Sequence, residues 1–158
     1  MPVQISARPI LNGTLVLALI AGVVAGGVAQ QKQETLYKRL GGYDAIAAVM
    51  DDFIGRLAND KQVSRFFNGV SADSLKRIRQ LAVDQVCAAT GGPCLYIGRS
   101  MRQSHEGLGI TDSDWQVMVG HFLATLDKFK VPQKEKDEVV AIVASLKPDI
   151  VIPNPPKK

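Results

Sequence analysis

Two histidines, His105 and His121, are the first candidates for chemistry in this chain. His105 lies in the segment MRQSHEGLGI, at residues 101–110, which glycines interrupt. An isolated imidazole can ligate a metal, or it can serve as a hydrogen-bonded structural residue. The spacing of the two histidines does not by itself decide between these roles.

Other patterns argue against the common enzyme classes. Cys87 and Cys94 are separated by six residues, and no histidine or carboxylate pair stands at a spacing that would complete a tetrahedral zinc site. The sequence has no G-x-S-x-G turn and no glycine-rich phosphate loop after a strand. The two cysteines either form a disulfide across the turn at residues 91–93 or stay reduced as small core residues.

Length and composition predict one compact globular domain. The 158 residues are 46% hydrophobic and 22% charged, which provides enough apolar surface for a core. The 19 basic and 15 acidic residues give a net charge of +4. This excess is mild, so we expect no nucleic-acid partner.

Residues 1–29 have the pattern of an export segment. Arg8 precedes an uncharged apolar run, LVLALIAGVVAGGVA, at residues 15–29. The run fits a signal peptide cut after Ala29 or a retained membrane anchor. A helix buried in the fold is the weaker alternative, because no polar face repeats at helical spacing. We therefore expect an exported domain, periplasmic or anchored outside the cytoplasm, that meets a membrane only through this segment.

The rest of the sequence predicts an all-α fold. Glycine and proline stops separate the expected helices, which are residues 35–40, 43–59, 74–90, 111–130 and 132–148, with an irregular piece at 99–106. Asp73 is the expected N-cap of the 74–90 helix, and Thr111 with Asp114 forms the expected capping box of the next. The folded domain should cover residues 30–147, followed by a proline-rich, extended or disordered tail at 148–158.

Several motifs in these segments occur together in one known family. They are LxxxLGG at residues 36–42, DF to FF at 52–67, AATGGP at 88–93, YxG at 96–98 and MxxxHxGxGI at 101–110. With these motifs in this order, the chain resembles the group I truncated haemoglobins over about residues 35–151. The resemblance implies a two-over-two helical sandwich around one haem b, with His105 as the proximal ligand of the iron.

The chemistry of the residues agrees with this implied role. An imidazole whose second nitrogen donates to a backbone carbonyl keeps a fixed tautomer and orientation, and the carbonyl of Met101 is the expected acceptor. The resemblance implies apolar haem contacts, two arginines for the haem carboxylates and a tyrosine at the same edge. These haem contacts are Phe53, Ile54, Phe67, Ile78, Ala82, Val86, Tyr96, Arg99, Met101, Arg102, Trp115 and Met118. Judged from spacing alone, the apolar members would be ordinary core residues.

The distal side departs from the family pattern. Ile54 stands where many members have a tyrosine, and Ile78 and Ala82 stand where they have glutamines. Leu81 replaces a second haem-binding histidine found in some members. A pocket without a donor should lower dioxygen affinity by about 1–3 kcal/mol, and carbon monoxide affinity by less. Gln85 is the nearest possible donor, although a solvent-facing position is the expected one.

These features favour reversible binding of oxygen or another diatomic gas, such as carbon monoxide or nitric oxide. One alternative is a nitric oxide dioxygenase that depends on an external reductase, but the pocket lacks a donor and the chain has no reductase domain. The other is haem electron transfer, which needs a second axial ligand that Leu81 does not supply. His121 is expected to be a packed or surface residue.

Overall fold

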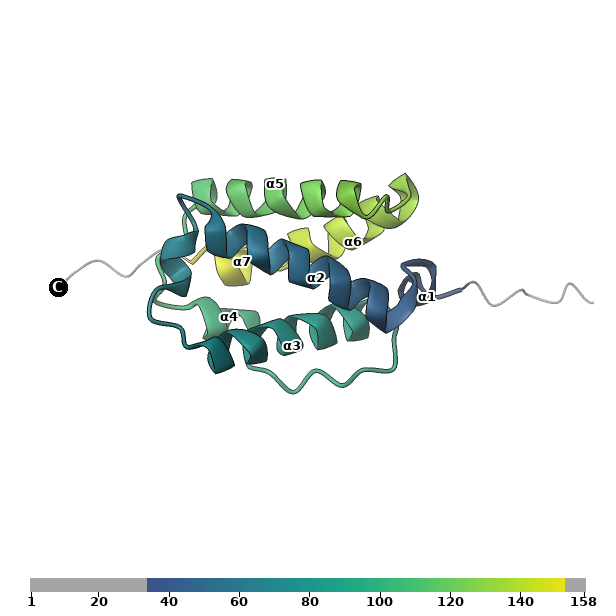
Figure 1. Cartoon of the computed structure of the whole chain (residues 1–158), viewed down its shortest axis with the longest axis horizontal. Helices are drawn as coiled ribbons and strands as arrows, with labels where there is room; N and C mark the ends of the chain where they lie inside the picture. The colour runs from purple at the N-terminus through teal and green to yellow at the C-terminus, as the bar shows by residue number, and fades with distance from the viewer. Residues whose placement is uncertain (1–33, 153–158) are drawn as a thin grey trace, which may run out of the picture. The chain divides into compact units, whose positions relative to one another are not determined.

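The computed structural model describes residues 34–152, and every regular element in this range is a helix (Figure 1). The predicted all-α class is therefore confirmed for these residues, which fall within a single compact unit. The predicted export or anchor segment and the end of the tail lie outside the described residues. None of the described helices is long and apolar enough to cross a bilayer.

The helices follow the glycine and proline stops read from the sequence. They are α1 (Leu36–Arg39), α2 (Gly42–Asn59), α3 (Ala72–Ala89), α4 (Met101–His105), α5 (Asp112–Lys128), α6 (Gln133–Ser145) and α7 (Lys147–Ile150), with the 3-10 helix η1 (Ser64–Phe67) between α2 and α3. The piece expected to be irregular thus contains one short helix, α4.

The ends of two helices test the predicted caps. The predicted N-cap of α3 was wrong, because Ser71 rather than Asp73 takes the extended capping conformation and its hydroxyl accepts a hydrogen bond from the backbone N–H of Ser74. Asp73 lies instead in the first turn, where its charge complements the helix dipole. The predicted capping box of Thr111 and Asp114 at the start of α5 is confirmed.

The C-terminal part of the chain differs from the prediction. α6 ends at Ser145, and α7 follows at residues that we expected to begin the extended tail. Pro148 lies in the first turn of α7, where a helix needs no backbone N–H from it, so the proline does not prevent helix formation.

α2 organises the hydrophobic core. It packs against α3 and also against α5 (Figure 1). The buried cluster includes Met50 and Phe53 from α2, Val83 from α3 and Phe122 from α5. The rings of Phe53 and Phe122 meet edge to face, with their centroids 5.2 Å apart. α4 packs closely against α7, whereas neither α3 nor α4 is closely packed against α5 or α6.

Candidate functional site

The short helix α4 positions His105. Its first turn is closed by a capping box, in which the Ser100 hydroxyl and the Gln103 side chain each accept a hydrogen bond from the other residue's backbone N–H. His105 is the last residue of α4, and its Nδ1 lies 2.8 Å from the carbonyl oxygen of Met101, which confirms the expected contact. A carbonyl only accepts, so Nδ1 carries a proton, and in the neutral imidazole Nε2 is then the nitrogen with the lone pair. Within residues 34–152 no hydrogen bond engages Nε2, which is therefore free to act as a ligand.

Two contacts fasten α4 to α7. The Arg102 guanidinium donates from Nε to Asp149 Oδ1 at 3.2 Å and from a terminal nitrogen to the Pro148 carbonyl at 3.4 Å. Sequence reasoning missed Asp149, because it lies 47 positions after Arg102 in the sequence. The dipeptide Pro148-Asp149 could have indicated a helix at this point, since this pair is typical of the first turn of a helix.

The other polar residues expected at the haem edge lie just before α4. The guanidinium of Arg99 is exposed and forms no ion pair within the described part of the chain. The hydroxyl of Tyr96 donates to the backbone carbonyl of Arg99 at 2.6 Å, so it stabilises the local turn. Arg99 therefore remains available for an anionic group, while Arg102 already has a carboxylate partner.

The expected apolar haem contacts differ in how deeply they are buried from solvent. Buried members are Phe53, Ile54 and Trp115, and half-buried members packed on the core are Ala82, Val86 and Met118. Outside the core cluster lie the buried Trp115 and three members on η1, α3 and α4, namely Phe67, Ile78 and Met101. Phe67 and Met101 are half-buried, and Ile78 is 41% exposed. Partly uncovered apolar side chains, a free imidazole nitrogen and an exposed arginine fit a flat apolar cofactor with carboxylate groups.

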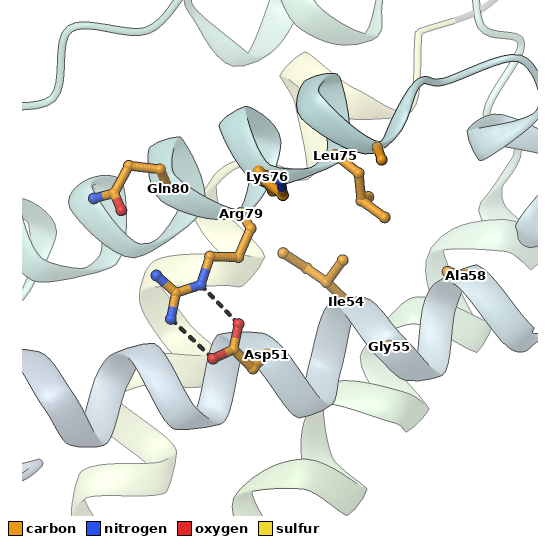
Figure 2. Close-up of a pocket in the computed structure, with 9 residues that line it drawn as sticks. Asp51, Ile54, Gly55, Ala58, Leu75, Lys76, Arg79 and Gln80 are labelled. Atoms are coloured by element: carbon orange, nitrogen blue, oxygen red, sulfur yellow. Dashed lines mark hydrogen bonds and ion pairs between the residues drawn. The ribbon is translucent and has the colours of Figure 1, made fainter.

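A groove of about 690 Å³ lies between α2 and α3 and is lined by residues of both helices (Figure 2). Ile54 forms part of its lining together with Leu75. Arg79 bridges the two helices through paired hydrogen bonds of 2.7 and 2.8 Å to Asp51. The hydrogen bond from Arg79 holds the pKa of the Asp51 carboxyl below its usual value.

The distal positions offer no hydrogen-bond donor. Ile54, Ile78 and Ala82 are apolar at the sites where the resemblance placed polar residues. Gln80 is committed elsewhere, because its amide nitrogen donates to the Tyr43 hydroxyl at 2.6 Å and to Asp84 at 3.0 Å. Gln85 is half-buried rather than fully exposed.

His121 has a structural partner. Its Nε2 lies 2.9 Å from Asp60 Oδ2, and the second carboxylate oxygen of Asp60 accepts from the backbone N–H groups of Gln62 and Val63. The hydrogen bond from His121, supported by the two backbone donors, lowers the pKa of Asp60 to about 2. His121 therefore joins the end of α2 to α5 as a partly buried structural residue.

The cysteines form a disulfide, Cys87 to Cys94, which decides between the two alternatives left open by the sequence. The turn between them needs glycine at residue 92, because a Cβ atom there would lie 2.7 Å from the Sγ of Cys87 and 2.5 Å from the Tyr37 ring. The bridge fastens the segment before α4 to the end of α3.

Comparisons with known proteins agree on one family. The model of the bacterial-like globin family matches residues 35–152. The group 1 truncated hemoglobin GlbN of Mycolicibacterium paratuberculosis is 34% identical over 116 residues, which cover 73% of this chain and 83% of that protein. GlbN of Synechocystis is 32% identical over 115 residues, covering 70% of this chain and 90% of that protein. This chain belongs to the bacterial-like globin family, and the relatives it matches are group 1 truncated haemoglobins.

Solved structures support the predicted two-over-two globin fold. The 2/2 hemoglobin of Synechococcus sp. PCC 7002, solved in the cyanomet state with covalently attached heme, matches with a TM-score of 0.68 and 32% identity. The match covers 75% of this chain and 98% of that one. THB1 of Chlamydomonas reinhardtii matches with a TM-score of 0.63 and 30% identity, covering 75% of this chain and 97% of that one.

Proposed function

We propose that this chain holds one haem b, with His105 Nε2 as the protein ligand of the iron, and reversibly binds a diatomic gas such as oxygen, carbon monoxide or nitric oxide. The observation that carries the proposal is the 2.8 Å hydrogen bond between His105 Nδ1 and the Met101 carbonyl. It fixes the tautomer in which Nε2 is the free nitrogen. Membership of a family whose solved members include a heme protein supports the same reading.

Each part of the site has a separate role toward the haem. The iron supplies an open coordination position for the gas when haem is bound. α4 orients His105, and the partly uncovered side chains of Phe67, Ile78 and Met101 exclude water from the cofactor. Arg99 offers a charge-assisted hydrogen bond to a haem carboxylate.

The apolar distal residues determine the ligand preference. Ile54, Ile78 and Ala82 cannot donate a hydrogen bond to a polarised ligand. Oxygen binding depends on such a donor more than carbon monoxide binding does, so the site favours carbon monoxide over oxygen. The missing donor lowers oxygen affinity by about ten- to hundredfold relative to a pocket that has one.

Haem titration of the domain at residues 30–158 tests the proposal. The wild-type domain should bind haem at one equivalent with a sharp Soret band, and His105→Ala should lose tight binding. His121→Ala is the matched control, because that imidazole bonds to Asp60, and it should still bind one equivalent. Equal haem binding by the His105→Ala domain would refute the assignment of His105.

We also propose that the globin domain works outside the cytoplasm, exported or anchored through residues 1–29. The apolar run at residues 15–29 supports this. The Cys87–Cys94 disulfide also supports it, since disulfides persist mainly in oxidising compartments. Fractionation of a bacterial host that makes the full chain should find the globin in the periplasm or membrane, and N-terminal sequencing should show whether Gln30 is the first residue. A full-length chain found only in the cytoplasm would contradict the proposal.

A further inference from the structure

The loop between α3 and α4 carries two unusually exposed apolar side chains. Leu95 is 79% exposed and Ile97 is 78% exposed, whereas no other large hydrophobic side chain among residues 34–152 exceeds 45%. Exposed apolar side chains that lie close together mark surfaces that meet a partner or a membrane. Neither residue takes part in the haem site described above.

The loop holds these two side chains in a fixed direction. From residue 94 to residue 99 burial alternates strictly: Cys94, Tyr96 and Gly98 are half-buried, and the residues between them are exposed. Cys94 is bonded to Cys87 of α3, and the Tyr96 hydroxyl donates to the Arg99 carbonyl. A Cβ at Gly98 would lie 2.3 Å from the Tyr96 hydroxyl oxygen, so the ring closes tightly over that glycine.

The base of this loop lies beside the point where the described chain begins. The backbone N–H of Tyr37 donates to the Thr90 carbonyl at 2.8 Å, and a Cβ at Gly91 would lie 3.3 Å from the Thr35 side chain. In Figure 1, α1 and the end of α3 lie at the same end of the molecule. In the sequence, residues 30–34 separate this point from the apolar run at residues 15–29.

The charges around the loop match an anionic bilayer surface. Lys38 is exposed on α1, next to the base of the loop, and the whole chain has a net charge of +4. Apolar side chains flanked by basic ones are typical of segments that bind the interface of anionic membranes.

We propose that the loop at residues 94–99 is a membrane-contact loop, which inserts Leu95 and Ile97 into the interfacial region of an anionic lipid bilayer and places Lys38 near the headgroups. This extends the expectation from sequence that only residues 1–29 meet a membrane. The disulfide and the Tyr96 contact keep the loop preformed, so little ordering entropy opposes the insertion.

Vesicle binding by the haem-loaded domain at residues 30–158 tests the proposal without the N-terminal segment. The domain has its own core, and the family model lies entirely within it. In co-sedimentation with vesicles of phosphatidylcholine and phosphatidylglycerol (3:1), Leu95→Ser/Ile97→Ser should weaken binding by about tenfold or more. Lys38→Gln, or vesicles without phosphatidylglycerol, should weaken binding by about fivefold.

The matched control is Phe129→Ser, which removes another exposed apolar side chain at the end of α5. It should bind vesicles as the wild type does, while circular dichroism and the Soret band show that each variant is folded. Failure of the wild-type domain to bind, or equal binding by the double variant, would overturn the proposal. A wild-type dimer in sedimentation velocity that the double variant abolishes would also overturn it, and would assign the loop to contact between two copies.

Discussion

Arg102 of α4 and Asp149 of α7 form an ion pair, with Nε and Oδ1 3.2 Å apart. Both side chains are about half exposed, so the pair itself contributes no more than about 1 kcal/mol to the free energy of unfolding. Its importance is positional, because α4 carries His105 and has few other helical neighbours. The C-terminal helix thus restrains the proposed haem-binding helix.

Asp149→Asn should therefore affect haem retention more than stability. We expect haem to transfer severalfold faster from this variant to excess apomyoglobin, with a change of less than about 1 kcal/mol in urea unfolding. Asp73→Asn is the control, because it breaks an exposed ion pair with Lys76 on α3. A haem transfer rate equal to that of the wild type would show that the pair does not restrain α4.

A donor introduced on the distal side should slow oxygen dissociation. Ala82→Gln places an amide on α3 at a half-buried position of the proposed pocket. The new hydrogen bond should reduce the oxygen dissociation rate about tenfold and change carbon monoxide dissociation much less. Stopped-flow measurement of both rates checks this, with Ala89→Gln at the exposed end of α3 as the control. Unchanged oxygen dissociation in Ala82→Gln would argue against Ala82 lying at the bound gas.

Asp60 should contribute to acid sensitivity. Its pKa is lowered from 3.8 to about 2 in the folded chain, first by the hydrogen bond from His121 and then by the backbone donors. A lowered carboxyl pKa stabilises the fold fully above pH 3.8, and this stabilisation disappears as the pH falls to about 2.

The Asp60→Asn variant should therefore be less stable than the wild type at neutral pH. Its free energy of unfolding should also fall less steeply between pH 3.8 and 2 than that of the wild type. Urea unfolding at a series of pH values measures both effects, with Asp73→Asn as a charge-matched control. Equal slopes in the wild type and the Asp60→Asn variant would contradict the role assigned to Asp60.

The Cys87–Cys94 disulfide closes a short loop, with a sequence separation of 7. For a loop of this size the chain-entropy model predicts a stabilisation of about 2–3 kcal/mol. Cys87→Ala/Cys94→Ala should lower the free energy of unfolding by that amount under oxidising conditions. The wild type should show no thiol reactive to Ellman's reagent until a reductant is added. Two reactive thiols in the unreduced, denatured wild type would refute the bridge.

Local features of the fold could be predicted because their signals are local. The glycine and proline stops located the helices, and Thr111 with Asp114 identified the start of α5. The error at α3 arose because Ser71 and Asp73 are both good caps, and only the backbone conformation decides between them. The tail was misread because Pro148 was taken as a helix stop, although proline is tolerated in a first turn.

The site could be predicted only where one short segment contains it. Met101 and His105 are four residues apart, so their hydrogen bond follows from one helical turn. The partners of Arg102 and His121 lie far away in the sequence, and no local sequence pattern predicts them. The burial of Ile54 and the exposure of Ile78 likewise depend on how α2 and α3 pack.

Ligation of the iron by His105 is tested most directly by the resonance Raman spectrum of the dithionite-reduced, haem-loaded domain, recorded with the absorption spectrum before and after carbon monoxide is added. We expect a five-coordinate ferrous haem with an iron–histidine stretching band, which His105→Ala abolishes and His121→Ala retains. We also expect prompt carbon monoxide binding at the open distal position. A six-coordinate ferrous haem, or an iron–histidine band that persists in His105→Ala, would contradict ligation by His105 in a pocket without a second ligand.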